Sequence, residues 1–257
     1  MMRRTADGSA GDADYGAIGG AYGAYRQPEP RIAALIEQAL AGARTVVNVG
    51  AGAGSYESAA FDTTAVEPSA SMRAQRPPHL PAAVDAVAEH LPFADDAFDA
   101  AMTTFSVHQW SDLRAGLREM RRVARGPVVV LTCDPLLVRD FWLYEYAPLV
   151  LDAEARRYPS IDDITATLGG RAEVTTVPIP ADCRDGFNEA YYARPECLLD
   201  PAARQSCSAW SFVEPDVALG YTEHLRTDLA DGTWDERHGH LRRQPFLHGS
   251  LVLIRAT

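Results

Sequence analysis

Short apolar runs alternate with amphipathic segments along this chain of 257 residues. Runs rich in Val, Ile and Thr are typical of strands, whereas apolar residues spaced three and four apart are typical of helices. The runs predict seven strands, at residues 45–49, 63–67, 82–88, 100–107, 126–135, 171–179 and 250–257. The amphipathic spacing predicts helices at residues 30–40, 69–75, 111–124 and 141–160, and a short helix after residue 54. This alternation predicts a doubly wound α/β sheet.

The composition changes along the chain and divides it into five expected parts. Residues 1–14 are small and polar, so we expect a disordered tail there. Residues 15–40 combine tyrosines with a helix, and they fit either a surface strap or N-terminal lid helices. We assign the rest to a core at 41–180, a cap insertion over the sheet's carboxyl edge at 181–247, and a final core strand at 248–257.

The stretch from Thr45 to Glu67 carries the first candidate chemistry. Its strand leads into Gly50, Gly52 and Gly54, and glycine lets a loop turn sharply while a ligand approaches the backbone. Glu67 ends the next strand, where a carboxylate can accept hydrogen bonds from both hydroxyls of a ribose. The stretch therefore predicts a nucleoside site at the carboxyl edge of a parallel sheet. The alternative is that the glycines serve only close packing.

Charge and cysteine content narrow the choice of partner and compartment. All 24 basic residues are Arg, and 35 acidic residues give a net charge of −11, which disfavours nucleic acid and acidic membranes as partners. Without Lys, the chain has no residue for Schiff-base chemistry or a P-loop. Residues 1–14 lack the apolar segment of a signal peptide, and no apolar run is long enough to span a membrane. With four cysteines and no CxxC pair, we expect a soluble cytoplasmic protein.

Two nucleotide-binding families share a strand, a glycine loop and a following acidic residue. A dinucleotide-binding dehydrogenase needs the spacing G-x-G-x-x-G. Gly50 and Gly52 fit this spacing, but Ser55 occupies the third position and Gly54 lies one residue early. The third glycine is the one that allows close packing of helix and strand, so the dehydrogenase interpretation fails at that contact.

Four linked motifs resemble those of class I S-adenosylmethionine (SAM)-dependent methyltransferases. VVNVGAGAGSYE is similar to the first motif, an acidic residue followed by GxGxG, and AVEPSASM to the second, with Glu67 as the ribose-binding acid. AVAEHLPFADDAFDAAMTTFSVHQW resembles the LPF…FD stretch of the UbiE-like (methyltransferase type 11) branch. REMRRVARGPVVV resembles that branch's turn before the fifth strand. The motifs occur in the family's order and cover about residues 20–134.

The resemblance implies a Rossmann-like sheet with an antiparallel last strand, SAM as cofactor and a small-molecule methyl acceptor. Three positions depart from the family pattern: Asn48 replaces an Asp, Val87 replaces an Asp that contacts adenine, and Gly126–Pro127 replaces a glycine pair. The cofactor-binding residues that the resemblance implies are Tyr25, Arg26, Gly50, Ala51, Gly52, Glu67, Pro68, Met72, Ala88, Glu89, Thr104 and Phe105.

His108 is the candidate catalytic base and a candidate substrate contact. It follows the fourth strand directly, and a neutral imidazole can accept a proton at physiological pH. Trp110, Tyr191 and Tyr192 are further candidate substrate contacts, for which core packing is the alternative. The remaining histidines lack the carboxylate or Cys spacing of a metal site, so we expect no metal.

Two classes of function fit these residues. The first is a SAM-dependent methyltransferase that moves a methyl group to O, N or C of a small molecule, such as a secondary metabolite. The second is a SAM-binding scaffold or regulatory protein without transferase activity. The aromatic residues of the expected cap favour the enzyme, because a ligand pocket needs apolar walls. The sequence leaves the acceptor atom and the oligomeric state open.

Overall fold

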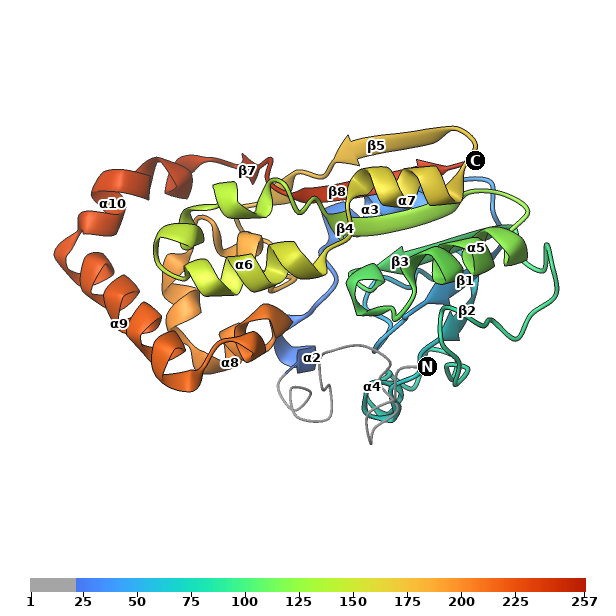
Figure 1. Cartoon of the computed structure of the whole chain (residues 1–257), viewed down its shortest axis with the longest axis horizontal. Helices are drawn as coiled ribbons and strands as arrows, with labels where there is room; N and C mark the ends of the chain where they lie inside the picture. The colour runs from blue at the N-terminus through green and yellow to red at the C-terminus, as the bar shows by residue number, and fades with distance from the viewer. Residues whose placement is uncertain (1–21) are drawn as a thin grey trace.

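A six-stranded sheet forms the centre of the computed structural model, which describes residues 22–257 (Figure 1). The expectations for residues 1–14 and 15–21 lie outside this range. The strand order is β2-β1-β3-β4-β8-β5, and β8 runs antiparallel to both neighbours. The predicted doubly wound fold with an antiparallel last strand is confirmed. The strands are β1 (Thr45–Val49), β2 (Asp62–Val66), β3 (Ala100–Thr104), β4 (Val128–Cys133), β5 (Ala172–Thr176) and β8 (Leu251–Ala256).

The predicted strand at 82–88 is wrong, because only Val84 pairs with the sheet. Its N–H donates to the Ala65 carbonyl at 2.8 Å, and its carbonyl accepts from the N–H of Glu67 at 3.0 Å. The Ala86 N–H then turns back to the Val84 carbonyl at 3.1 Å, which ends the ladder after one residue. Pro81, just before this segment, also has no N–H to donate to a ladder.

The predicted strand at 171–179 is divided. β5 ends at Thr176, and after Pro178 the chain forms β6 (Ile179–Pro180), which pairs with β7 (Phe246–Leu247) in a separate ribbon. The predicted helix at 141–160 is divided as well, into a 3-10 turn η3 (Trp142–Glu145) and helix α6 (Pro148–Arg157). Proline explains both divisions, of the predicted strand and of the predicted helix, because its ring and missing N–H interrupt strand ladders and helices.

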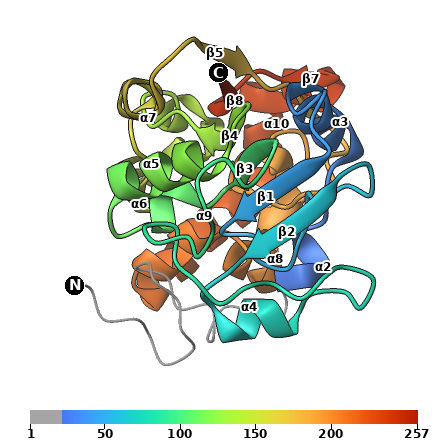
Figure 2. The same cartoon turned by 90° about the vertical axis from the view of Figure 1, so that its right-hand side faces the viewer.

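Helices cover both faces of the sheet, with α5 (Leu113–Val123) and α7 (Ile161–Leu168) on one and α3 (Pro30–Ala39) on the other (Figure 2). The sequence offers Ser111 or Asp112 as the cap of this helix, and in the structure the side chain of Asp112 accepts the Ala115 N–H at 3.0 Å and begins α5. The apolar stripe of α5 is fully buried against the sheet, and its buried members are Leu117, Met120 and Val123.

A second group of helices lies at the end of the molecule opposite β1 and β2 (Figure 1). One apolar cluster continues from α3 through the sheet into these helices and includes the buried rings of Trp142, Tyr146 and Trp234. Besides α6, this second group of helices contains α8 (Pro201–Gln205), α9 (Pro215–Asp231) and α10 (Thr233–His238), and the 3-10 turns η2 (Val138–Asp140), η4 (Asn188–Tyr191), η5 (Pro195–Leu199), η6 (Ser208–Phe212) and η7 (Gly239–Arg243).

No helix in the described range is long and apolar enough to cross a membrane.

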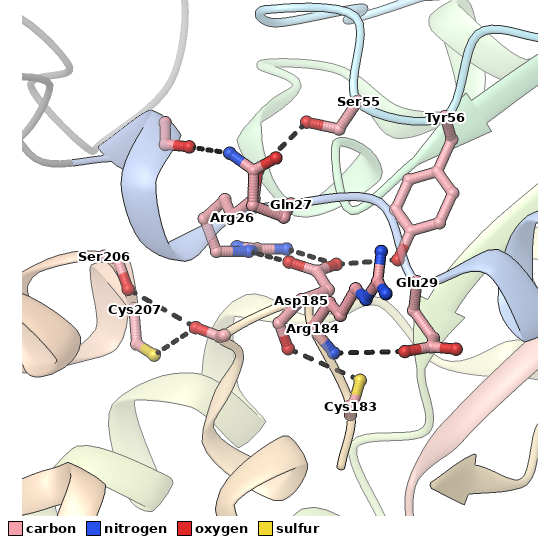
Figure 3. Close-up of polar contacts among 12 residues, drawn as sticks. Arg26, Gln27, Glu29, Ser55, Tyr56, Cys183, Arg184, Asp185, Ser206 and Cys207 are labelled. Carbon is pink, nitrogen blue, oxygen red and sulfur yellow. Dashed lines mark hydrogen bonds and ion pairs between the residues drawn. The ribbon is translucent and has the colours of Figure 1, made fainter.

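The segment 22–31, which we call the strap, begins with α2 (Tyr22–Tyr25) and is tied to residues 182–186. The guanidinium of Arg26 donates to both oxygens of Asp185, at 2.5 and 3.3 Å. The Tyr56 hydroxyl donates to the same carboxylate at 2.8 Å. Figure 3 shows these three side chains pointing toward one another. The buried carboxylate of Glu29 adds a second tie by accepting the Arg184 N–H at 3.1 Å.

Replacing Asp185 with Ala should lower the free energy of unfolding in urea by about 3 kcal/mol, because it removes a buried carboxylate that pairs with Arg26 and accepts the buried Tyr56 hydroxyl. Asp182→Ala is the matched control, since its carboxylate is 80% exposed and pairs only with a partly exposed Arg31. We expect the control to unfold at the wild-type urea concentration. Equal stability of both variants would contradict a structural role for Asp185.

Candidate functional site

The glycine loop follows β1 and turns sharply around the end of β2. Gly50, Gly52 and Gly54 have φ angles of +70°, +53° and +89°, which side chains with a Cβ rarely adopt. The N–H groups of Gly50 and Ala51 both donate to the Val66 carbonyl, at 2.9 and 3.0 Å. Residues 51–61, all of them described, consequently form turns, so the helix predicted after residue 54 is wrong. A helix N-terminus therefore contributes nothing to this loop.

Glu67 lies beside the loop, and two backbone groups fix its carboxylate. The Gly52 N–H donates to Oε2 and the Ser69 N–H donates to Oε1, both at 2.8 Å. Ser69 also caps α4 (Ala70–Ala74), as predicted, by accepting the Met72 N–H. Each carboxylate oxygen can accept more than one hydrogen bond, so a carboxylate fixed in this way can still accept from ligand hydroxyls.

A cavity opens over the loop and Glu67. It brings together all the positions that the sequence assigned to the cofactor except Tyr25, whose hydroxyl donates to Asp200 beside a separate surface groove. The cavity is lined by Arg26, Gly50, Ala51, Gly52, Ala53, Ser55, Tyr56, Glu67, Pro68, Met72, Ala88, Glu89, Thr104, Phe105, Ser106, Gln109, Trp110 and Asp185.

At position 50, on the floor of this cavity, only glycine fits without a clash. A Cβ at Gly50 would lie 1.8 Å from Ser106 Oγ, which in turn accepts the indole N–H of Trp110 at 3.0 Å. The other edge of the same indole lies against Gly116, where a Cβ would come within 2.5 Å of it. Trp110, a predicted substrate contact, is therefore fixed against the glycine loop and lines this first cavity.

The family motif has an Asp where this chain has Asn48, but another residue of the chain places a carboxylate beside this position. Asn48 Nδ2 donates to Glu57 Oε1 at 3.1 Å, and Glu57 forms a buried ion pair with Arg76 at 2.7 Å. A carboxylate thus lies directly behind the glycine loop although the family's Asp is absent. The sequence contains no local signal for this exchange.

Phe105 and Arg26 separate the first cavity from a second one and line both. Phe105 follows β3 with a φ of +51°, which is strained for a bulky side chain and is typical of functional sites. Its ring packs 5.3 Å from the ring of Phe187, and the guanidinium carbon of Arg26 lies 4.9 Å from its centre.

His108 lines the second cavity from the 3-10 turn η1 (Val107–Gln109). Its ring packs 4.7 Å from that of Tyr158, and Nδ1 is buried without a hydrogen-bond partner among the described residues. Burial, together with the charges of Arg157 and Arg26, holds the pKa of His108 well below its usual range. The imidazole is therefore neutral at physiological pH and a weak proton acceptor. The other lining residues are Glu154, Arg157, Tyr158, Phe187, Asn188, Ser206, Cys207, Ser208 and Ala209.

Tyr191 and Tyr192, the other predicted substrate contacts, lie outside both cavities. Tyr192 is fully buried and its hydroxyl donates to the Gln244 carbonyl at 2.6 Å, whereas Tyr191 borders the surface groove that Tyr25 also lines. Among the described residues no cluster of His, Cys, Asp and Glu could hold a metal ion.

The sequence missed the residues that the tertiary structure brings to the two cavities from far away. Asp185 is separated from Arg26 by 159 residues and from Tyr56 by 129. Glu154 and Asn188 belong to segments without any recognisable motif. No signal in a single sequence could have placed these side chains beside the glycine loop.

Comparison with known sequences agrees with the motifs. A family described as a methyltransferase domain matches residues 47–130, from β1 into β4. The chain is 37% identical over 149 residues to YafE of Escherichia coli K12, an uncharacterized protein, covering 55% of this chain and 71% of that one. It is 42% identical over 60 residues to a demethylmenaquinone methyltransferase of Roseiflexus, covering 21% of this chain and 25% of that enzyme.

Solved structures extend the similarity over nearly the whole chain. A candidate methyltransferase from an antibiotic biosynthesis pathway of Anabaena variabilis superposes with a TM-score of 0.84 at 29% identity, covering 91% of this chain and 99% of that one. The fold also occurs in a geranyl diphosphate C-methyltransferase of Streptomyces coelicolor, solved with S-adenosylhomocysteine, at a TM-score of 0.50 and 16% identity over 88% of this chain and 78% of that one. The chain belongs to the class I SAM-dependent methyltransferases, and its cofactor is SAM.

Proposed function

We propose that this enzyme transfers the methyl group of SAM to a small molecule bound in the second cavity. The observation that carries this proposal is the junction of the two cavities at Arg26 and Phe105. Methyl transfer needs the acceptor in line with the sulfur–methyl bond, and two adjoining cavities can hold the cofactor and the acceptor side by side.

The first cavity is the proposed cofactor site. Glu67 would accept the ribose hydroxyls, and the side-chain-free floor at Gly50 and Gly52 would let the cofactor contact the backbone. Arg26, held by Asp185, would lie near the methionine carboxylate. Bound SAM supplies the methyl group and a leaving group. The other proposed cofactor residues are Ala51, Pro68, Met72, Ala88, Glu89, Thr104 and Phe105.

The second cavity is the proposed acceptor site, with His108 as a substrate contact. Because its pKa is held low, we assign His108 a hydrogen-bonding role toward the acceptor in preference to the role of general base. Trp110 is proposed to contact the substrate only from the cofactor side. Tyr191 and Tyr192 are proposed to support the cap behind the site.

The surrounding segments take supporting roles in this proposal. The strap and α3 would act as a lid, and residues 181–247 as a cap over the core. Net charge −11 supports a small-molecule acceptor over nucleic acid. The four free cysteines support a reducing compartment such as the cytoplasm.

Transfer from SAM carrying a CD3 group tests the function directly. The enzyme is incubated with labelled SAM and a small-molecule extract of the cells that encode it, and products are detected by mass spectrometry. We expect a labelled small molecule and S-adenosylhomocysteine in equal amounts. SAM binding without any labelled product would instead favour a SAM-binding scaffold or regulatory protein.

Glu67→Ala should raise the dissociation constant of SAM by about 10–100-fold, because it removes charge-assisted hydrogen bonds to the ribose. Calorimetry measures the change. Glu223→Gln on the exposed face of α9 is the control and should bind SAM like the wild type. An unchanged affinity of Glu67→Ala would refute the ribose assignment.

His108→Asn should raise the KM for the acceptor found by labelling, with a loss of kcat below about tenfold and SAM affinity within a few fold. The expectation follows from a neutral imidazole that binds the acceptor without taking its proton. Steady-state kinetics separates the two constants. A fall in kcat of about 100-fold at constant KM would show instead that His108 is the base.

A further inference from the structure

A line of buried hydrogen bonds crosses the cap and ends in the second cavity. The indole N–H of Trp210 donates to Asn188 Oδ1 at 3.0 Å, and Asn188 Nδ2 donates to Glu154 Oε2 at 2.7 Å. The three residues belong to η6, η4 and α6, which are separate elements. The line fixes the Asn188 amide, because its oxygen can only accept and its nitrogen can only donate. It thereby fixes the carboxyl group of Glu154 as well.

Oε1 of Glu154 accepts no hydrogen bond from any described residue, although Glu154 lines the cavity. Because Glu154 lines the cavity and is only partly buried, Oε1 can accept a hydrogen bond from a ligand there. Nδ1 of His108, in the same cavity lining, is buried and lacks a partner among the described residues. An available carboxylate oxygen and an unpartnered imidazole nitrogen around one cavity fit a ligand that carries hydrogen-bond donors.

On the basis of the proposed function, we propose that Glu154 binds the nucleophilic group of the methyl acceptor through Oε1 and receives its proton. The acceptor is then a small alcohol, phenol or amine, and the methylated atom is O or N. Polar side chains elsewhere in the cavity, such as Ser206 and Ser208, fit a polar acceptor better than a hydrocarbon chain.

The step balances in atoms and charge. A lone pair of the acceptor's O or N forms the new bond to the methyl carbon, and the sulfur keeps the electron pair of the bond that breaks. The proton of the same O or N goes to Oε1 of Glu154. A sulfonium and a carboxylate are consumed and a thioether and a carboxylic acid are formed. Loss of both charges is favourable in a site that excludes water.

The electrostatic surroundings support Glu154 as the proton acceptor. Burial raises the pKa of Glu154, against the opposing effects of the Asn188 hydrogen bond and the charges of Arg157 and Arg26. The same cavity lowers the pKa of His108, so histidine loses its usual advantage as a base. The titratable and charged groups that face Glu154 from the surrounding elements are Arg26, His108, Cys133, Arg157, Tyr158, Glu189 and Cys207.

The position of the CD3 label in the wild-type product tests the acceptor class without any variant. Fragmentation spectra and NMR of the product should place the group on O or N. A label on carbon would overturn the inference while leaving the proposed function intact. Absence of any labelled product, with SAM still bound, would refute the proposed function and the inference together.

Glu154→Gln tests the residue itself. We expect kcat to fall by about 100-fold or more, while the affinity for SAM stays within twofold. The wild-type rate should rise with pH through the pKa of Glu154, above its ordinary value of 4.5, because only the ionised carboxylate accepts a proton. In Glu154→Gln this rise of the rate with pH, the acidic limb of the pH–rate profile, should be absent. Glu236→Gln, an exposed position on α10, is the control. It should keep the wild-type rate and the acidic limb of the pH–rate profile.

A second variant covers the case in which Glu154→Gln does not fold. Trp210→Phe removes the N–H that fixes Asn188 and keeps an aromatic ring at the position, so Glu154 remains but is held less firmly. We expect kcat to fall by about 3–10-fold while the acidic limb of the pH–rate profile is retained. Calorimetry should show weaker binding of the acceptor to the complex of the enzyme with S-adenosylhomocysteine. Wild-type kinetics and acceptor binding in Glu154→Gln, or in Trp210→Phe where Glu154→Gln does not fold, would overturn the role of Glu154.

Discussion

The carboxylate of Asp185 is the point on which the two cavities depend. It binds Arg26 of the strap and Tyr56 of the glycine loop, and it belongs to the segment that leads into the cap. Three parts of the chain therefore meet at one buried acidic group, and a single antiparallel β-bridge between Arg26 and Asp185 also joins two of them. This pair helps to hold Arg26 where it lines both cavities.

A carboxylate lies near the glycine loop although position 48 is Asn, because Glu57 contacts that residue. Asn48 cannot supply a carboxylate, but it donates to Glu57, whose charge is balanced by Arg76. A carboxylate at position 48 would lie against Glu57 and repel it, so the exchange involves both positions. The departure from the family motif is thus compensated within the same loop and does not argue against a cofactor site.

The two cavities differ in chemistry in a way that suits a two-substrate reaction. The first combines the backbone of the glycine loop and apolar side chains with the charged Arg26, Glu67, Glu89 and Asp185, which fits a large cofactor that has both apolar and charged parts. Ionisable and hydroxyl side chains dominate the second. Phe105 stands between them in a strained conformation that costs about 1–3 kcal/mol and is held by its packing against Phe187 and Arg26.

The sequence by itself determined the parallel strands β1 to β4, helix α5, and those residues of the first cavity that follow the ends of the strands. Those residues follow consecutive strands, and the carboxyl ends of parallel strands meet at one edge, so local patterns suffice. Only the tertiary structure decided that residues 82–88 pair at a single position, that the glycine loop forms turns, and that Glu154 and Asn188 meet His108. These outcomes depend on contacts between residues distant in the chain, and such contacts are determined by packing and by the satisfaction of buried polar groups, neither of which a local pattern records.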